Sequence, residues 1–497
     1  MPISLITDMA AETLGDRVAL GRSRDGLTHT ALRRAALGGA GLVAASGHRS
    51  VAFVGVNGPV VAALLFASAY AGVPFTPLNY RLSAEALRVQ LDRLDDPLVV
   101  TDAAFRGVVG DRRARPSEDW IADALAAPEH EPTAWDDDAT AVVLFTSGTT
   151  SEPKRVLLRH ANLLSYVLQT VEFASADPQD AILVSVPPYH IAGMGTILSN
   201  VYSGRRMVHL PAFAPGAWLD LVRAERITNA MLVPTMLSRL VDELGGAEAG
   251  TSSLRQLAYG GARMPRPVLE GALRAFPGVG FTNAYGLTET SSTIAVLGPD
   301  DHREALAATD PAAAARLASV GRPVPGVEIE VRGDGGRVLP AGEVGEVWVR
   351  GPQVSGEYVG LGSVLDEQGW FPTRDQGHLD AEGFLFVGGR SDDTIIRGGE
   401  NIAPAEIEDQ LVLHASVKDV AVVGLPDDEW GERLVAVVVP AAPIEDVDEL
   451  TRWVKARVRG SRTPDEIRFA DELPYNPTGK LLRRELRARL IAAGGES

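Results

Sequence analysis

The stretch that decides the fold reads Phe145-Thr146-Ser147-Gly148-Thr149-Thr150-Ser151-Glu152-Pro153-Lys154, and it continues an apolar, strand-like run that begins at Ala141. Small residues and hydroxyls let such a loop close around phosphate oxygens, and the lysine adds a positive charge. A Walker P-loop has glycine before the lysine and serine or threonine after it, whereas Pro153 and Arg155 stand at those places here. The stretch therefore predicts a phosphate-binding loop of a kind other than that of the Walker nucleotidases.

Composition indicates a soluble, multidomain protein. The chain has 497 residues, of which 45% are hydrophobic and 23% are charged, and this length exceeds that of one ordinary domain. The net charge of −18 argues against a nucleic-acid or anionic-membrane partner. There is no cysteine, which excludes disulfides, thiolate catalysis and cysteine-ligated zinc. The nine histidines form no His-x-x-x-His pair, so we expect no built-in transition-metal site.

The sequence predicts a cytoplasmic protein without a membrane span. The residues Met1-Pro2-Ile3-Ser4-Leu5 lack the basic region and apolar core of a secretory signal. The longest apolar stretch, Val60–Phe75, is interrupted by Gly72 and Pro74 and is too short to cross a bilayer, so we expect a buried helix there. The sequence leaves open whether two chains form a homodimer.

Strand-like runs alternate with segments of helical periodicity over most of the chain. Segments 161–173 and 217–225 have helical spacing, and the strand-like runs are Val51–Val56, Ile182–Val186, Met231–Val233 and Val279–Thr282. This alternation predicts βα units and largely parallel sheets, an α/β fold that binds ligands beyond the carboxyl ends of its strands.

The pattern of predicted elements changes near residue 320. Alternating strands, Val327–Val331 and Glu346–Arg350, are separated by glycine and proline and predict an antiparallel sheet or a small barrel. After Arg390 the pattern becomes compact α+β. We therefore predict an N-terminal domain of residues 1–390, made of βα-layered sheets with a small β-barrel-like part, and a C-terminal α+β domain of residues 391–497.

Four further motifs follow the first stretch in order. They are Tyr285-Gly286-Leu287-Thr288-Glu289, Thr373-Arg374-Asp375, Gly389-Arg390-Ser391-Asp392-Asp393 with the segment 397–408 after it, and Asn476-Pro477-Thr478-Gly479-Lys480-Leu481. Together the five resemble the signatures of the acyl-adenylate-forming superfamily and look closest to its acyl- and aryl-CoA ligases. The resemblance implies that ATP activates a carboxylic acid as acyl-AMP with release of pyrophosphate, and that CoA then takes the acyl group as a thioester. It also implies a mobile C-terminal domain with its hinge at Asp392.

The resemblance places ATP and Mg²⁺ on these motifs. Glu289 would ligate Mg²⁺, because a carboxylate is an oxygen ligand that this ion accepts. Asp375 would bind the ribose hydroxyls, and Lys480 would bridge the reacting carboxylate and the α-phosphate, where a cation stabilises the developing charge. The catalytic residues would be Lys480, Thr288, Glu289 and His190. The full set for ATP or AMP would be Thr146, Ser147, Gly148, Thr149, Thr150, Lys154, Gly261, Ala262, Asn283, Ala284, Tyr285, Gly286, Thr288, Asp375, Arg390 and Lys480.

The resemblance also implies sites for CoA and for the acid. The CoA site would consist of Arg81, Gly398, Gly399, Trp430 and Arg462, with Trp430 stacked on adenine and the glycines lining the pantetheine tunnel. The acid site would consist of His190, Ile191, Ala192, Gly260, Gly261, Gly286, Ser291 and Ser292. Its residues are mostly small, and no acidic partner for an ammonium group stands among them. A bulky hydrophobic or ring-bearing acid fits such a pocket better than acetate does.

Three positions depart from the family pattern, because Ser151, Arg155 and Arg374 stand where glycine is usual. Two other interpretations of the motifs remain. A stand-alone adenylation enzyme would load the phosphopantetheine of a carrier protein, and a non-catalytic relative would only bind. Retention of Lys480 and Glu289 argues against the second. Trp430 with Arg81 favours CoA over a carrier protein, which brings no CoA adenine to stack. Nothing in the sequence supports a luciferase-like oxygenase.

Overall fold

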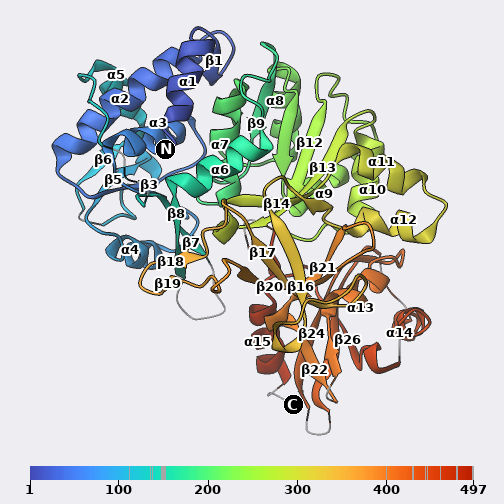
Figure 1. Ribbon diagram of the computed structural model, residues 1–497. Helices are drawn as coiled ribbons and strands as arrows, with labels where there is room; N and C mark the ends of the chain where they lie inside the picture. Colours follow the sequence, from blue (N-terminus) through green and yellow to red (C-terminus); the bar gives the residue numbers. More distant parts are fainter. Residues whose placement is uncertain are drawn as a thin grey trace.

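The computed structural model describes residues 1–110, 112–134, 136, 138–146, 153–398, 400–427, 430–442, 444, 446–458, 460–476 and 479–494 (Figure 1). A large N-terminal domain contains two extended sheets and a smaller antiparallel sheet. A smaller α+β domain follows it toward the C-terminus. This arrangement confirms the predicted fold class.

The strand before the phosphate loop lies in a sheet of eight strands among the described residues. The order is β19 (Gly362–Ser363), β18 (Glu357–Tyr358), β8 (Lys154–Arg159), β7 (Thr140–Thr146), β4 (Phe75–Pro77), β3 (Ser50–Val54), β5 (Pro97–Thr101) and β6 (Ala114–Pro116). The strands from β7 to β6 pair in parallel, and those from β7 to β19 pair antiparallel. Thr146 pairs with Lys154, so an antiparallel hairpin closes the base of the predicted loop.

The second large sheet has nine strands in the described part of the chain. The order is β15 (Arg322–Pro323), β14 (Ser292–Leu297), β13 (Gly280–Leu287), β12 (Gln256–Gly260), β11 (Asn229–Leu232), β9 (Ala181–Val184), β10 (Arg206–His209), β1 (Val18–Leu20) and β2 (Leu27–Thr28). The predicted strands at 182–186 and 231–233 are confirmed as β9 and β11. The strand predicted at 279–282 is longer and runs to Leu287. It continues because Gly286 allows β14 to approach closely: a Cβ there would lie 1.8 Å from the Ser292 carbonyl oxygen.

Helices pack on both large sheets. They are α1 (Leu5–Leu14), α2 (His29–Ser46), α3 (Pro59–Ala71), α4 (Ala84–Asp92), α5 (Ser117–Ala126), α6 (His160–Thr170), α7 (Ile191–Ser203), α8 (Pro215–Ala224), α9 (Pro234–Leu244), α10 (Arg266–Ala275), α11 (Pro299–Ala307) and α12 (Pro311–Ala315). One core joins α3, α7 and strands of both sheets, and a second joins α8, α9 and α10 to the nine-stranded sheet.

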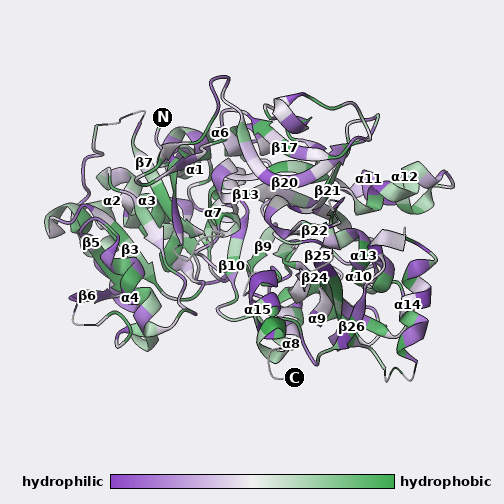
Figure 2. Ribbon diagram, turned by 90° about the horizontal axis from the view of Figure 1, so that it is seen from below, coloured by the Kyte–Doolittle hydropathy of each residue, from purple (hydrophilic) through white to green (hydrophobic). Residues whose placement is uncertain are grey.

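Helix α3 is apolar on every side and buried, as its sequence predicts (Figure 2). Pro59 begins it and Gly72, at φ +70°, ends it in the left-handed conformation that glycine adopts readily. Across the described ranges, no helix combines the length and the apolar character that crossing a membrane requires.

The region after residue 320 forms an antiparallel sheet, in the order β16 (Glu328–Arg332), β17 (Gly345–Arg350), β20 (Phe371–Leu379) and β21 (Leu385–Arg390). The segment η5 (Ser391–Asp393) follows β21 directly. The C-terminal domain contains β22 (Ile395–Arg397), β23 (Glu400–Ile402), α13 (Pro404–Leu411), β24 (Val417–Asp427), β25 (Gly431–Pro440), α14 (Val447–Lys455), β26 (Glu466–Phe469) and α15 (Arg483–Gly494). The domain limit at 390/391 and the hinge at Asp392 stay predictions.

Two buried histidines predict that the fold is sensitive to acid. His29 and His160 are 1% and 3% exposed. Burial lowers the pKa of each to about 4, with Arg17 adding to the effect at His29 and the N-terminal amine at His160. At pH values between 4 and 6.5, the unfolded chain therefore binds a proton at each of these histidines, whereas the folded chain leaves them neutral. The contribution of these neutral histidines to the free energy of unfolding is complete above pH 6.5. Between pH 6.5 and pH 4 it falls by about 1.4 kcal/mol per histidine for each pH unit.

We expect the free energy of unfolding to decline steeply from pH 6.5 to pH 4. Urea unfolding at several pH values measures this slope. His29→Phe should flatten it by about one proton. An unchanged slope in His29→Phe would contradict the assignment.

Candidate active site

Three predicted residues from distant parts of the chain form one hydrogen-bonded group. Asp375 on β20 is 6% exposed. The Tyr285 hydroxyl on β13 donates to its Oδ2 at 2.5 Å, and Arg390 Nε on β21 lies 3.1 Å from its Oδ1. Burial raises the pKa of the Asp375 carboxyl, while Arg390 and Tyr285 oppose the shift. An acceptor carboxylate is thus held in place by a cation and a hydroxyl.

Beside this group, Glu289 and Lys154 both lie close to Tyr358. Glu289 follows β13 in the short segment η2 (Thr288–Thr290). The Tyr358 hydroxyl donates to Glu289 Oε1 at 2.8 Å, and Lys154 Nζ lies 5.2 Å from the centre of the Tyr358 ring. Burial, and then the Glu289 charge, raise the pKa of the tyrosine. The loop-closing lysine and the predicted Mg²⁺ ligand therefore lie at one place.

Sequence reasoning missed Tyr358. Its segment, Gly356-Glu357-Tyr358, has no motif that would single it out. It reaches the site because β18 pairs with β8, which puts Tyr358 opposite Val156. Glu289 is fixed from the same segment, since its carbonyl accepts from the N–H groups of Ser355 and Gly356 at 2.8 and 3.2 Å.

Lys480 comes to this place from the C-terminal domain. Burial lowers its pKa, and the Arg390 guanidinium adds to the shift. The carboxylates of Asp393, Asp375 and Glu289 oppose it. Since all these charges act on one ammonium group, Lys480 lies within electrostatic range of the residues predicted for ribose and Mg²⁺.

The residues predicted for adenine lie on neighbouring parallel strands. Asn283 and Ala284 on β13 stand opposite Tyr259 and Gly260 on β12, and Gly261 and Ala262 follow that strand. The Asn283 amide donates to the Ser319 carbonyl at 3.3 Å. The register of two strands thus gathers the predicted set at the sheet edge where open α/β folds bind ligands.

The predicted acid site contains a histidine that is neutral near pH 7. His190 precedes α7, and its ring lies 4.6 Å from the Tyr189 ring. Its Nε2 is buried, with no hydrogen-bond partner among the described residues. Burial lowers its pKa to about 3, and the nearby Arg81 adds to the shift. Ile191 and Ala192 follow in the first turn of the helix.

The same helix faces the strained start of β14. A Cβ at Gly195 would lie 3.2 Å from Ser292 Oγ. Ser291 and Ser292 have φ values of +55° and +112°, which L-residues adopt at a cost of ~1–3 kcal/mol each. Ser291 Oγ is buried and has no partner within the described residues. Non-glycine residues with such backbone angles concentrate at functional sites. By contrast, a Cβ at Gly260 would meet the Ala284 carbonyl oxygen at 2.2 Å, so this glycine is required by strand packing.

The predicted CoA residues fall into separate groups. Gly398 and Trp430 are adjacent: the Gly398 N–H donates to the Trp430 carbonyl at 2.8 Å, and the indole is 48% exposed. Arg462 pairs with Glu406. Arg81 is exposed on the N-terminal domain, 5.6 Å from the centre of the Tyr80 ring. No hydrogen bond, ion pair or ring contact in the described part of the chain joins Arg81 to Trp430.

Five predicted residues lie outside the described residues: Ser147, Gly148, Thr149, Thr150 and Gly399. Of the three departures from the family pattern, Ser151 also lies there. The Arg155 guanidinium donates to the Arg93 carbonyl. Arg93 in turn donates to the Pro153 carbonyl at 2.9 Å, so the two arginines tie the end of the loop to the C-terminal end of α4.

Arg374 has a backbone conformation that suits glycine. Its φ is +65°, and the register of β17 with β20 shifts at this point. The resulting bulge turns Asp375 toward the site. The side chain is 65% exposed, with Nε 3.8 Å from Glu346 Oε1.

We expect Arg374→Gly to stabilise the protein by about 1 kcal/mol, because glycine carries no Cβ penalty in the left-handed region. Calorimetric melting of the variant measures this. Arg374→Ala removes the same charge but keeps the Cβ, so it should not stabilise. Equal gains in both variants would show that the charge, and not the backbone angle, is responsible.

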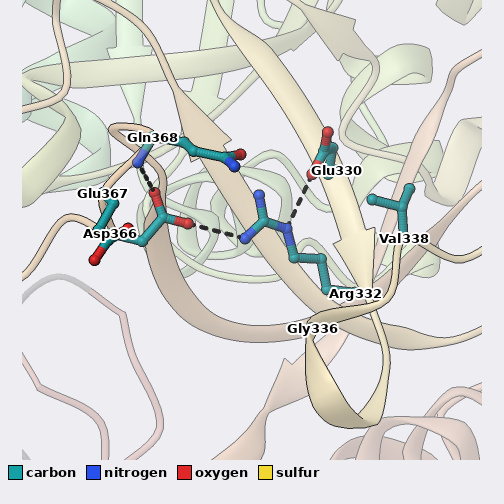
Figure 3. A pocket seen from close by; sticks show the side chains of 7 residues that line it. All are labelled: Glu330, Arg332, Gly336, Val338, Asp366, Glu367 and Gln368. Atoms are coloured by element: carbon teal, nitrogen blue, oxygen red, sulfur yellow. Dashed lines mark hydrogen bonds and ion pairs between the residues drawn. The ribbon is translucent and has the colours of Figure 1, made fainter.

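A pocket of about 470 Å³ lies elsewhere, against β16 of the antiparallel sheet (Figure 3). Its lining includes Arg332, whose guanidinium pairs with Glu330 at 2.9 Å and Asp366 at 3.1 Å. None of the predicted site residues lines it. It is therefore distinct from the candidate site.

Known proteins share this chain's whole architecture. Residues 7–359 match the model of the AMP-binding enzyme family, and residues 406–480 match that of the AMP-binding enzyme C-terminal domain. Feruloyl-CoA synthase of Amycolatopsis sp is 34% identical over 454 residues, covering 88% of each chain. The fatty acid–[acyl-carrier-protein] ligase ScoC of Streptomyces coeruleorubidus is 34% identical over 472 residues, covering 91% of this chain and 88% of that protein.

A solved structure extends the likeness to the fold. The o-succinylbenzoate CoA synthetase of Bacillus subtilis, in complex with its acyl-adenylate intermediate, superposes with a TM-score of 0.84 at 30% identity and 98% coverage of both chains. Another structure of that enzyme contains ATP and a magnesium ion. The residues gathered here, a carboxylate for Mg²⁺ with lysines for phosphate, fit the same ligands. The chain therefore belongs to the AMP-binding enzyme family, as one of its AMP-forming acid–CoA ligases.

Proposed function

We propose that this ligase activates a bulky, ring-bearing carboxylic acid, and that the gathered residues perform the adenylation half of its reaction. One observation carries the proposal: Asp375 and Arg390 pair at 3.1 Å, and their charges, with that of Glu289, act on Lys480 of the C-terminal domain. These four residues come from separate motifs and would surround one nucleotide.

Asp375 would accept hydrogen bonds from the two ribose hydroxyls of ATP. The hydroxyl of Tyr285 and the guanidinium of Arg390 hold its carboxylate, so it is oriented before the nucleotide arrives. Preorganised acceptors avoid the cost of reorganisation at the moment of reaction. Asn283 and Ala284, with Gly261 and Ala262 on the neighbouring segment, would place the adenine.

Glu289 would hold Mg²⁺. Magnesium is usually bound by one or two carboxylates together with substrate phosphates, and when bound here it would neutralise charge on the leaving pyrophosphate. No cluster of three or more acidic or histidine ligands exists among the residues described, which fits such a shared site. Tyr358 orients Glu289 through its hydroxyl, and Lys154 would bind the phosphates beside it. Thr288 would hydrogen-bond the α-phosphate.

Lys480 would lie between the carboxylate of the acid and the α-phosphate. A carboxylate oxygen attacks the α-phosphorus, the bond to the β-phosphate oxygen breaks, and pyrophosphate leaves with that electron pair. Both reactants are anionic, so an ammonium group between them lowers their repulsion and stabilises the charge of the transition state. The lowered pKa of Lys480 reflects its burial, and the carboxylates nearby favour its charged form.

His190 would border the acid site as a neutral imidazole. Its unpartnered Nε2 can hydrogen-bond a substrate oxygen without adding a charge. Ile191, Ala192, Gly286, Ser291 and Ser292 would complete a mainly apolar wall. The ring-bearing acids named for the feruloyl-CoA and o-succinylbenzoate relatives support a ring-bearing substrate here.

CoA would enter after the C-terminal domain turns about Asp392. Arg81 lies on one domain and the other predicted CoA residues on the second, and this rotation would bring them onto one ligand. A cytoplasmic location and a homodimer stay predictions. Size-exclusion chromatography with light scattering tests the homodimer.

We expect Trp430→Ala to raise the KM for CoA about 5- to 150-fold, because stacking of a base on an aromatic ring contributes about 1–3 kcal/mol. The KM values for ATP and the acid should hardly change. Steady-state kinetics with each substrate varied measures this, and Trp453→Ala serves as a control indole of the same domain. Weaker ATP binding in Trp430→Ala would contradict the assignment.

Acid-dependent exchange of pyrophosphate into ATP, measured over acids from acetate to bicyclic and long-chain acids, tests the substrate class. Adding CoA or a phosphopantetheinylated carrier protein then tests the acceptor. The carrier-bound alternative has one supporting observation, the similarity to the ScoC ligase. Preference for acetate or an amino acid would overturn the proposed acid class, and transfer to the carrier alone would overturn CoA as acceptor.

A further inference from the structure

The two domains are joined by an ion pair beside the nucleotide site. Arg263 lies in the segment between β12 and α10, directly after Gly261 and Ala262. Its guanidinium contacts the Asp409 carboxylate and donates to the Ala405 carbonyl at 3.2 Å. Residues 405 and 409 lie one turn apart on the same face of α13.

A second contact lies along α9. Lys418 Nζ on β24 is 3.4 Å from Asp242 Oδ2, near the C-terminal end of that helix. At the other end, Thr235 lies close to Gly479, where an added Cβ would come within 2.7 Å of the threonine hydroxyl. The interface therefore extends from the segment before α10 to the residue that precedes Lys480.

Helix α13 is also bound to the segment that carries Lys480. Arg483 donates to both oxygens of Glu408, at 2.5 and 2.8 Å, and burial leaves the Arg483 side chain 19% exposed. Glu408 is the neighbour of Asp409. The Tyr475 hydroxyl donates to Asp419 Oδ2 at 2.9 Å and so ties the other side of the Lys480 turn to β24. These hydrogen bonds therefore hold α13 and the segment of Lys480 together, so a displacement of α13 also displaces Lys480.

We propose that Arg263 and Asp409 are positioning residues, which hold the C-terminal domain where Lys480 reaches the acid and the α-phosphate. This inference rests on the proposed role of Lys480 in adenylation. The pair acts only in this arrangement of the domains, because any rotation that withdraws Lys480 also moves α13 away from Arg263. It thus favours adenylation over the thioester step, and it links the segment predicted to bind adenine to the position of the catalytic lysine.

The two half-reactions, measured separately, test this inference. The Arg263 and Asp409 side chains are 42% and 47% exposed. An ion pair this exposed changes the equilibrium between the positions of the C-terminal domain by no more than about five-fold. We expect Asp409→Ala to slow acid-dependent pyrophosphate exchange about three- to five-fold, and to leave thioester formation from supplied acyl-AMP unchanged or faster. The double variant Arg263→Asp with Asp409→Arg should restore exchange. Glu270→Ala is the matched control, because it removes a pair with Arg266 that stays within α10.

Equal losses in both half-reactions, or no loss in either, would overturn the inference. A wild-type enzyme without acid-dependent exchange would overturn the proposed function instead. A covalent link gives an independent measurement, since the chain contains no cysteine. Arg263→Cys with Asp409→Cys, joined by a short bis-maleimide, should retain exchange and lose thioester formation. Thioester formation at the wild-type rate in the joined protein would also overturn the inference.

Discussion

Lys480→Ala should lower the rate of acyl-AMP formation by about 10²- to 10³-fold, the loss typical for a missing electrostatic donor. The residue is half-buried among Arg390, Asp375 and Glu289, so no solvent cation replaces it well. Transfer from supplied acyl-AMP to CoA should fall far less, because the proposed rotation removes Lys480 from the site before that step. Pyrophosphate exchange and single-turnover thioester formation measure the two effects.

Lys455→Ala provides the control for the loss of a lysine, since Lys455 is exposed on α14 of the same domain. It should leave both half-reactions unchanged. A Lys480→Ala enzyme that loses both half-reactions equally would refute the proposal that the C-terminal domain takes one position for adenylation and another for thioester formation. The assignment of the adenylation site would still stand.

Asp375→Ala should damage both nucleotide binding and the fold. The change removes the acceptor of the Tyr285 hydroxyl and the partner of Arg390, whose side chain is 35% exposed. Breaking one side of a largely buried pair costs about 3 kcal/mol of stability. Loss of the two ribose hydrogen bonds should raise the KM for ATP about 100-fold, at ~1.5 kcal/mol for each bond to a charged group. Urea unfolding and ATP titration of the exchange reaction measure the two effects.

Glu328→Ala is the matched control for stability, because its pair with Arg350 lies on the surface of the same antiparallel sheet. Exposed pairs contribute little to stability, because water and salt screen their charges. Asp375→Asn retains the shape and should keep more of the stability than of the ATP affinity. If Asp375→Asn binds ATP as well as the wild type does, the ribose assignment is wrong.

The sequence by itself determined the chemistry and the order of the parts. Five motifs implied an adenylating CoA ligase, and the comparisons show that family. Periodicity located β3, β9, β11 and α3 to within a few residues, because an element that is buried throughout records its environment in its own composition. Where an element ends depends on contacts with other elements. The strand predicted at 279–282 runs on to Leu287, because Gly286 allows β14 to approach closely.

Only the tertiary structure decided which motif residues meet. Tyr358 reaches Glu289 through the pairing of β18 with β8, and the Arg263–Asp409 pair exists only because α13 lies against the segment before α10. In the sequence, Arg374 departs from the family pattern. In the structure it has a positive φ of the kind that glycine adopts, and Asp375 still lies in the site. Sequence spacing records neither strand register nor the docking of one domain on another. Both depend on contacts between residues separated by tens to hundreds of positions, and it is these contacts that turn a list of motifs into one site.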